Sequence, residues 1–218
     1  MSDIIARLQA VDACAVSDAL DTLGLPGVAL GLERLSTQKP VRGRVTTVRL
    51  VPAGRAAPSG RHLGTAAVEA SGAGDVIVVD HGGRNDVSGW GGNLSLAAAQ
   101  RGVEGVIVDG ACRDLDESRD LDLPVFARGA VPITARGRVV EQDWNIPVTI
   151  SGVEVHPGDY VIADGSGVVF IPADRGAEVL DAAEAVVERE RQMAEQIRQG
   201  VPISQVMGAK YETMLEKA

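Results

Sequence analysis

The stretch GWGGNLSLAAAQRGVEGVIVDGACRDLDE (89–117) combines the two kinds of secondary structure on which the fold depends. After its glycine-rich start, the run LSLAAAQR predicts a helix that Asn93 caps and Gly102 ends. The apolar run GVIVD (105–109) then predicts a strand that is buried on both faces. A helix followed directly by such a strand indicates an α/β protein.

The segments on either side extend this alternation. VIVVD (76–80) predicts a second buried strand, and HGGRNDVSGWGG (81–92) predicts a glycine-rich loop after it. Further strands are expected near 124–126 and 131–133, and short β segments with Pro-Gly-Asp turns follow up to residue 172.

A long charged helix is expected over 174–199. Its apolar residues form a narrow stripe at helical spacing, namely Val179, Val186, Met193 and Ile197. We interpret this stripe as a packing surface, within one subunit or between subunits. Residues 174–218 are therefore expected to form a C-terminal helical extension of one domain that spans 1–218.

Composition excludes several classes of protein. The 218 residues carry a net charge of -9 and only 3% aromatic residues, which argues against nucleic-acid or anionic-membrane partners. Cys14 and Cys112 have neither the spacing of a zinc site nor that of a disulfide framework. The N-terminus does not resemble a secretory signal, and we expect a cytoplasmic protein.

The predicted strands both end in an acid, Asp80 and Asp109, and sites in α/β proteins assemble at the carboxyl ends of strands. The helix after Gly91-Gly92-Asn93 begins with free backbone N–H groups, which bind carboxylate or phosphate. If the strands are neighbours, Arg113 and Asp114 lie close to that helix start.

Such a group of residues can bind an oxo-acid. Arg113 can form two hydrogen bonds to a carboxylate, and Asp114 can hold Mg²⁺ or Mn²⁺, beside which an enolate forms as a carbon–carbon bond breaks. A structural alternative stays open for each residue. Arg113 and Asp114 can be a surface ion pair, and Asp80 and Asp109 can simply cap their strands.

At this point the chain resembles a known family, that of the regulator of ribonuclease E activity A and the class II 4-hydroxy-4-methyl-2-oxoglutarate aldolases. The resembling stretches are VSDALDTLG (16–24), GDVIVVD (74–80), WGGNLSLAAAQRGVEGVIVDGACRDLDE (90–117) and PGDYVIADGSGVVFIP (157–172). They are spread over most of the chain, and the block from Trp-Gly-Gly to Arg-Asp is the most specific.

The resemblance implies a layered α/β/β/α core of the swivelling-domain type, and homotrimers that pair into hexamers. It implies a site between subunits for pyruvate and magnesium. Arg113 contacts the substrate there and Asp114 anchors the metal. The substrate-binding backbone carries over to Gly91, Gly92, Asn93 and Leu94.

The sequence also departs from the family pattern. Aldolases of the family have an acid, thought to orient a catalytic water, where this chain has Gly92, and Ser166 replaces a common aspartate. The residues that can substitute for the missing acid are Asp86, Asp116 and Glu117. An acid donated by a neighbouring subunit would be Glu188 or Glu190, and the sequence does not distinguish them.

These observations predict a divalent-metal-dependent lyase that acts on a 2-oxo acid, by aldol cleavage with release of pyruvate or by decarboxylation of an oxaloacetate-type substrate. One alternative is a non-catalytic regulator that inhibits a ribonuclease by protein contact. Another is a divergent enzyme that uses the same metal site for dehydration or hydrolysis. Some members of the family carry the name of a methyltransferase, but the chain has no motif for a methyl-donor cofactor.

Overall fold

The computed structural model describes residues 4–57 and 60–208, which fold around one large mixed sheet. In spatial order the sheet contains β1, β11, β10, β3, β4, β5, β6 and β2, and β7 also pairs with β3. The strands are β1 (Val28–Ala29), β2 (Glu33–Arg34), β3 (Val41–Pro52), β4 (Asp75–Ser88), β5 (Gly105–Cys112), β6 (Val125–Ala130), β7 (Val139–Trp144), β10 (Tyr160–Ala163) and β11 (Val168–Ile171). A separate hairpin is formed by β8 (Val148–Ile150) and β9 (Val153–Val155).

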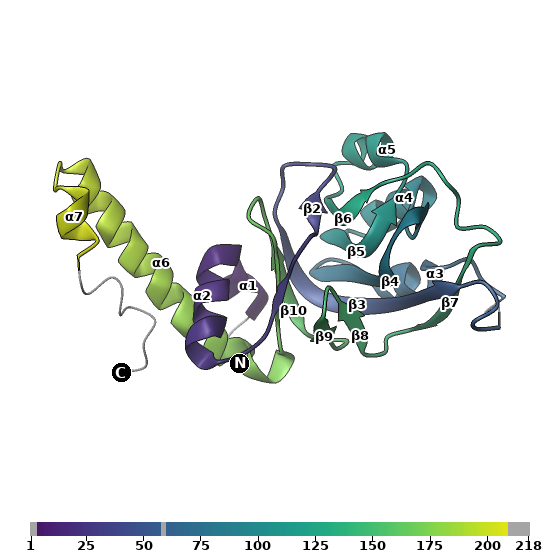
Figure 1. The fold of residues 1–218 in the computed structure, drawn as a ribbon, viewed down its shortest axis with the longest axis horizontal. Helices are drawn as coiled ribbons and strands as arrows, with labels where there is room; N and C mark the ends of the chain where they lie inside the picture. Colours follow the sequence, from purple (N-terminus) through teal and green to yellow (C-terminus); the bar gives the residue numbers. More distant parts are fainter. Residues whose placement is uncertain (1–3, 58–59, 209–218) are drawn as a thin grey trace.

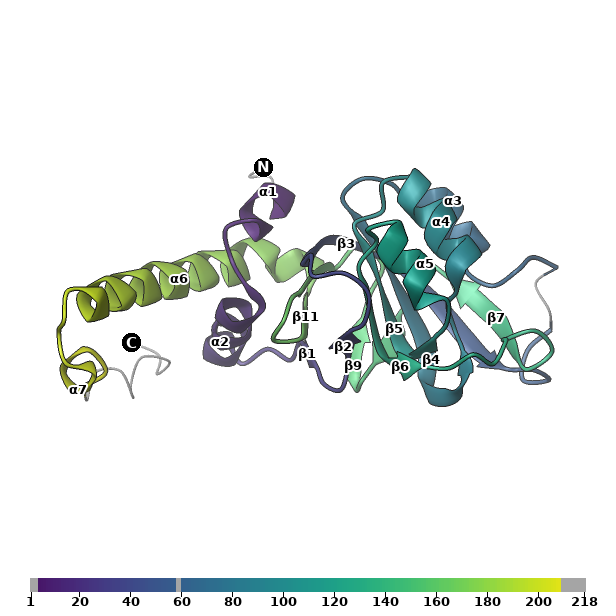
Figure 2. The same cartoon turned by 90° about the horizontal axis from the view of Figure 1, so that it is seen from above.

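The centre of the sheet is parallel, since β3 pairs in parallel with β4, β4 with β5, and β5 with β6. All eight residues of β5 are buried, which agrees with the prediction from its continuous apolar sequence. Helices α3 (Thr65–Ala70), α4 (Gly92–Gln100) and α5 (Leu115–Asp120) cover one face of these strands (Figure 2).

Three apolar clusters separate four layers. The first lies between α3–α5 and the parallel strands of the sheet, and the second lies between those parallel strands and the part of the molecule formed by β8–β11. The third lies between β10–β11 and the helices α1 (Ile4–Leu8), α2 (Ala13–Leu23) and α6 (Gly176–Arg198). Alternate residues of β11 explain this arrangement, because Val168 and Phe170 enter the second cluster whereas Val169 and Ile171 enter the third. The mixed α/β fold expected from the sequence is confirmed.

Two local predictions are wrong. Residues 81–88 are not a loop but the second half of β4, which continues past two register irregularities and pairs again with β5. Gly82 and Gly83, both at positive φ, allow this bulge. The strand expected at 131–133 is also absent from the structure there, although Val131 N and Ile133 O form single hydrogen bonds to the ends of β5 and β4.

The C-terminal helix extends away from the sheet (Figure 1). It begins at Gly176, after a 3₁₀ turn at Ala173–Arg175, and runs to Arg198, close to the predicted bounds. Val179 and Val186 are buried, whereas Ile197 is 44% exposed. The apolar stripe therefore packs on the body only along its first half. The short helix α7 (Ile203–Val206) follows, and the remainder of the expected extension lies outside the described residues.

No helix within residues 4–57 and 60–208 combines the length and the apolar character that crossing a membrane requires.

Candidate functional site

The site forms where the segments that follow the main pairing of β4 and β5 run side by side. Ser88 pairs with Ala111, and Gly89 N donates a hydrogen bond to Ala111 O at 2.8 Å. Arg113 N donates to Trp90 O at 3.0 Å. The structure therefore brings the start of α4 next to the Arg-Asp pair, as the sequence predicted.

Asp114 is the central side chain of this site. Its backbone is left-handed, with φ 58° and ψ 39°, and its Oδ2 accepts hydrogen bonds from Gly92 N at 3.0 Å and from Arg113 Nε at 2.9 Å. A carboxylate at the start of a helix is favourably placed in the field of the helix dipole. Asn93 is not the cap that we predicted, because α4 begins one residue earlier, at Gly92. The N-cap residue Gly91 has no side chain, and Asp114 caps the helix instead.

Two glycines make room for carboxylates at this helix start. A Cβ atom added to Gly91 would lie 2.9 Å from Asp114 Oδ2 and 3.1 Å from Arg113 Cγ. A Cβ atom added to Gly92 would lie only 1.7 Å from Glu117 Oε2. The Glu117 carboxylate thus occupies the space that a side chain at position 92 would take. Of the three candidate acids, Glu117 is the one whose carboxylate lies against position 92.

The backbone amides at the helix start are not all free. Gly92 N already donates to Asp114, and Leu94 N donates to Gly91 O at 3.1 Å. Asn93 N has no acceptor among the residues that the structure describes. Of the backbone groups that the resemblance assigned to substrate, the Asn93 amide is therefore open to a ligand.

A buried series of hydrogen bonds through two serine hydroxyl groups ends on the backbone carbonyl of Asp114. Trp90 Nε1 donates to Ser95 Oγ at 2.9 Å, and Ser95 Oγ lies 2.9 Å from Ser118 Oγ. Ser118 Oγ in turn donates to the Asp114 carbonyl at 3.4 Å. Sequence reasoning missed both serines, although their spacing puts each on the inner face of its helix.

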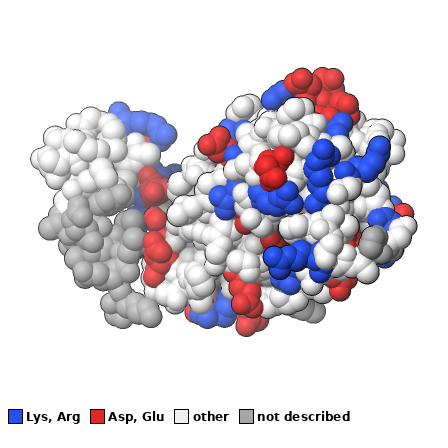
Figure 3. Space-filling model, turned by 45° about the vertical axis from the view of Figure 1, so that its right-hand side comes forward, with Lys and Arg blue, Asp and Glu red and all other residues white. Residues whose placement is uncertain are grey.

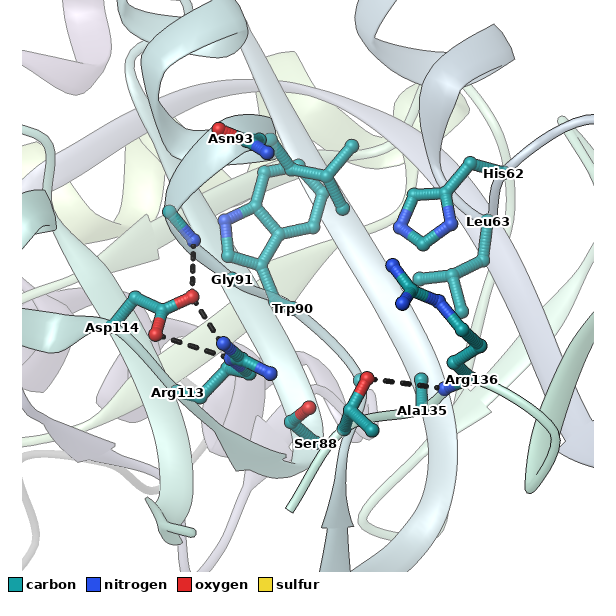
Figure 4. Close-up of a pocket in the computed structure, with 14 residues that line it drawn as sticks. His62, Leu63, Ser88, Trp90, Gly91, Asn93, Arg113, Asp114, Ala135 and Arg136 are labelled. Atoms are coloured by element: carbon teal, nitrogen blue, oxygen red, sulfur yellow. Dashed lines mark hydrogen bonds and ion pairs between the residues drawn. The ribbon is translucent and has the colours of Figure 1, made fainter. Parts of the chain in front are cut away.

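A pocket opens above this group and has a second wall that the sequence did not predict (Figure 4). Arg113 and Asp114 lie on one side of it, and the side chains of His62 and Arg136 lie next to each other on the opposite side. The lining residues are His62, Leu63, Ser88, Gly89, Trp90, Gly91, Gly92, Asn93, Leu94, Arg113, Asp114, Thr134, Ala135 and Arg136. His62 and Arg136 are far apart in sequence, so no local motif could have joined them.

The two acids at the strand ends are held in ion pairs. The Asp109 side chain is 7% exposed, pairs with Arg128 Nε and accepts from Ser151 N at 2.8 Å. Asp80 Oδ2 lies 3.4 Å from Arg49 Nε. Neither acid lines the pocket, so the structural interpretation of both residues holds.

The other candidate acids on this side of the molecule already have partners. Asp86 is paired with Arg84, whose hydrogen bonds hold the pKa of Asp86 below its usual value. Asp116 is paired with Arg119 on the exposed face of α5. Both acids are absent from the pocket lining, and so is Glu117; Asp116 and Glu117 line a second hollow, which Arg113 and Asp114 also border.

Glu188 and Glu190 lie on α6, and Figures 1 and 2 place α6 at the far end of the molecule from α4 and α5. The hydrogen bonds from Arg191 lower the pKa of Glu188 to about 2. Burial, followed by the charges of Asp12 and Asp18, raises the pKa of Glu190. Neither glutamate contributes to the site of its own chain.

Two further polar residues, His81 and the Ser166 that departs from the family pattern, serve the fold. His81 is 1% exposed, its Nε2 lies 2.9 Å from Val87 O, and burial lowers its pKa. Ser166 N donates to Asp164 Oδ1 at 2.8 Å in the turn between β10 and β11. That turn borders a different hollow, beside α2.

Few side chains near the pocket could act as ligands of a metal ion. Within the described residues there is no group of three or more His, Cys, Asp or Glu side chains that could surround an ion. Asp114 and Glu117, on either side of Gly92, are two carboxylates at one helix start. Mg²⁺ commonly binds through one or two carboxylates and retains several waters, so these residues fit magnesium better than a metal that needs a full protein cage.

Comparison with known proteins identifies the family. The family model RraA-like (Aldolase/RraA) matches residues 13–170, and the chain belongs to this family. A protein of Halalkalibacterium halodurans named as a candidate 4-hydroxy-4-methyl-2-oxoglutarate aldolase is 34% identical over 83% of this chain and 82% of its own length. Protein DlpA of Legionella pneumophila is 30% identical over 94% of this chain, which spans only 33% of that longer protein.

Solved structures show the same fold. An uncharacterized protein from Pseudomonas syringae pv. tomato superposes with a TM-score of 0.86 at 29% identity, over 95% of this chain and 98% of the other. Streptomyces coelicolor RraAS2, described as an unusual member of the RNase ES inhibitor RraA family, gives 0.75 at 26% identity, over 88% and 95% of the two chains. Relatives named as aldolases support a lyase-type function for the family, and relatives named as inhibitors support a regulatory one.

Proposed function

We propose that this protein is a magnesium-dependent lyase that cleaves a 2-oxo acid and releases pyruvate, by aldol cleavage or by decarboxylation of an oxaloacetate-type substrate. The observation that carries this proposal is the Glu117 carboxylate in the space beside Gly92, next to Asp114 and Arg113. An acid, a metal-binding carboxylate and a guanidinium are then together in one place, although the local sequence pattern lacks the acid.

Arg113 and the Asn93 amide bind the substrate carboxylate. Arg113 Nε is bonded to Asp114, so its two terminal nitrogens remain available to form paired hydrogen bonds to the substrate carboxylate. Asp114 would hold the magnesium ion, and Glu117 would hold a water molecule near it. Bound magnesium supplies positive charge that favours the enolate form of pyruvate.

Bond breaking leaves an electron pair at C3 of the substrate. The carbon–carbon bond beyond C3 breaks, the departing fragment leaves as a carbonyl compound or as CO₂, and the pair is delocalised as the enolate of pyruvate. The water that Glu117 holds then delivers a proton to C3, which gives pyruvate. In aldol cleavage the substrate's 4-hydroxyl group must also lose its proton, and the same carboxylate and water lie nearest to receive it.

The test is pyruvate formation from oxaloacetate with Mg²⁺ and then with EDTA. We expect turnover with Mg²⁺, none with EDTA, and a large loss in Glu117→Gln. Asp120→Asn is a matched control, because Asp120 is an exposed acid one turn further along the same helix. Equal loss in both variants, or turnover that EDTA leaves unchanged, would contradict the proposal.

A double variant tests whether Glu117 does the work of an acid at position 92. Gly92→Asp alone should be less active than the wild type, because it displaces the exposed Glu117 carboxylate and leaves two like charges at one helix start. Adding Glu117→Ala should restore activity, since one acid then remains at the position. If the double variant is no better than the single variant, the two positions are not equivalent.

We also propose that the chain forms homotrimers or hexamers in which a neighbour covers the site. The distal half of α6 projects from the body, and a second hollow on the other side of Arg113 and Asp114 lies open. Light scattering after size exclusion measures the subunit number, and a monomer at micromolar concentration would contradict this assembly.

The regulatory alternative is favoured by the likeness to RraAS2. A pure inhibitor needs neither the acid beside Gly92 nor an exposed Arg-Asp pair. The two proposals make different predictions for Asp114→Asn, which abolishes lyase activity but leaves an inhibitory protein contact elsewhere on the surface intact.

A further inference from the structure

A buried acid on β7 has no role in the proposed reaction so far. Glu141 is 5% exposed, and it pairs with Leu50 of β3, a residue of the first apolar cluster. Val139, two residues earlier on the same face of β7, belongs to that cluster as well. The alternation along β7 therefore calls for an apolar residue at position 141, and a carboxylate there costs free energy unless a donor compensates it.

The donor is a backbone amide at the edge of the pocket. Gly64 N donates to Glu141 Oε2 at 2.6 Å, and the bond is buried. Gly64 is the N-cap residue of α3 and has a positive φ of 76°. Thr65 Oγ1 donates to His62 O at 2.7 Å, so hydrogen bonds hold the chain at Gly64 and at the residues on both sides of it.

Gly64 packs on the floor of the pocket. A Cβ atom added to Gly64 would lie 3.4 Å from Trp90 Cζ3 and 3.4 Å from Leu94 Cδ1. Trp90 and Leu94 lie on either side of the segment 91–93, where α4 begins and where the Asn93 amide is open to a ligand. A displacement of Gly64 would therefore reach the backbone that binds the substrate carboxylate in the proposed reaction.

The same anchor lies behind the outer wall of the pocket. Four residues of the pocket lining also line a smaller hollow, namely His62, Leu63, Ala135 and Arg136. Glu141 lines that smaller hollow but not the pocket itself. Figure 4 shows the side chains of this wall opposite the Arg-Asp pair. Glu141 thus holds the wall from the side that faces away from the substrate.

Charge alone is an alternative reason for an acid at this position. Arg61 and Arg136 line the same hollow, and Figure 3 shows that Lys and Arg side chains gather on this part of the body. An acid that only balances these charges needs no particular length. An acid that holds Gly64 N must reach it from β7, and the side chain of Glu141 does so.

We propose that Glu141 is a positioning residue, which fixes one wall and the floor of the substrate pocket through the amide of Gly64. This inference rests on the proposed lyase function. Glu141 contacts neither substrate nor metal in that proposal and acts only through the backbone that it holds. Loss of the bond to Gly64 therefore weakens substrate binding and leaves the chemistry beside Asp114 in place.

Two substitutions separate reach from charge. Glu141→Gln keeps the length and an acceptor for Gly64 N, whereas Glu141→Asp keeps the charge on a side chain that is shorter by one methylene. The assay is exchange of the C3 hydrogens of pyruvate with deuterated water in the presence of Mg²⁺. We expect Glu141→Asp to raise KM for pyruvate about tenfold with little change in kcat, and Glu141→Gln to stay within about twofold of the wild type.

Glu104 provides a matched control. Its Oε1 accepts from Gly74 N at 3.0 Å, and Gly74 also has a positive φ, of 82°. Glu104 and Gly74 precede β5 and β4, whereas the site follows these strands, so this bond lies away from the pocket. Glu104→Asp shortens the same kind of anchor and should change neither KM nor kcat.

A second variant tests the same contact from its other end. Gly64→Ala places a Cβ atom against Trp90 and Leu94 at a positive φ, and it should raise KM for pyruvate in the same way. Urea unfolding identifies variants that do not fold. If Glu141→Asp is among them, the result for Gly64→Ala decides.

The outcomes distinguish this inference from the proposed function. Wild-type exchange with KM raised in Glu141→Asp, and not in Glu141→Gln or Glu104→Asp, supports the inference. A larger loss in Glu141→Gln than in Glu141→Asp, an equal loss in both, a loss confined to kcat, or an equal rise of KM in Glu104→Asp overturns it while the lyase proposal stands. Absence of exchange in the wild type rejects the proposed function, and this inference with it.

Discussion

Two aspartates at the end of β5 have opposite environments although they are five residues apart. Asp109 and Asp114 each pair with an arginine, but the Asp109 side chain is 7% exposed and Asp114 is 27% exposed. Asp109 joins three segments of the fold, because Arg128 on β6 and Ser151 between β8 and β9 both bind it. Asp114 has a left-handed backbone and borders an open pocket.

The difference separates an acid whose carboxylate is fully used by the fold from the acid that we propose acts in the site. The carboxylate of Asp109 has a protein donor on each oxygen and does not line the pocket that Asp114 borders. Asp114 has a positive φ, which costs energy in a non-glycine residue, and the surrounding hydrogen bonds maintain it. Strain of this kind beside a pocket is common where geometry serves function.

The largest effect that we expect is on activity. Asp114→Asn should reduce magnesium-dependent pyruvate formation by at least about a hundredfold, because the metal-binding charge is lost. The midpoint of thermal unfolding should change little, since a neutral amide oxygen can still accept from Gly92 N. Retention of more than half the activity would make Asp114 a structural residue like Asp109.

The next largest effect is on stability, at the other aspartate. Asp109→Ala should lower the free energy of unfolding by about 3 kcal/mol, because it leaves the Arg128 charge and the Ser151 amide without their acceptor. Urea unfolding measures this loss. Correctly folded enzyme at low temperature should keep its activity, and a selective loss of activity in folded protein would place Asp109 in the site.

A smaller effect is expected below Asp114. Ser118→Ala removes one hydroxyl from the chain that joins Trp90 and Ser95 to the Asp114 carbonyl. The free energy of unfolding should fall by about 1 kcal/mol, the usual net contribution of one hydrogen bond, with a modest drop in kcat. An unchanged unfolding midpoint would show that the hydroxyl chain does not support Asp114.

The smallest effect is a pH dependence at His81, whose ring packs against Gly89 before the site and Gly110 after Asp109. Burial lowers the pKa of His81 in the folded state below the value near 6.5 of an unfolded chain. As pH falls below about 6.5, the unfolded state therefore takes up a proton before the folded state, and stability decreases. Unfolding curves should show a weaker decrease in His81→Gln than in the wild type.

The sequence predicts the parts of this molecule that depend on local pattern. The continuous apolar run at 105–109 identified a buried central strand, and strand order placed Arg113 and Asp114 beside the start of α4. The cap of that helix could not be predicted, because Asp114 reaches it from another element.

Other features depend on tertiary packing alone. The extension of β4 through a glycine-rich stretch depends on pairing with β5, which local propensity does not include. The position of Glu117 in the space beside Gly92 and the wall of His62 and Arg136 both join residues from separate elements. The same applies to Asp109, whose interpretation depended on finding Arg128 and Ser151 around it.

The most direct test of this contrast is binding of Mn²⁺, a paramagnetic substitute for Mg²⁺, followed by electron paramagnetic resonance. Wild-type protein, Asp114→Asn and Asp109→Asn are titrated in parallel. We predict one site in the wild type, the same site with similar affinity in Asp109→Asn, and its loss in Asp114→Asn. Undiminished Mn²⁺ binding by Asp114→Asn would contradict the account, because the acid beside the pocket would then not be the one that holds the metal.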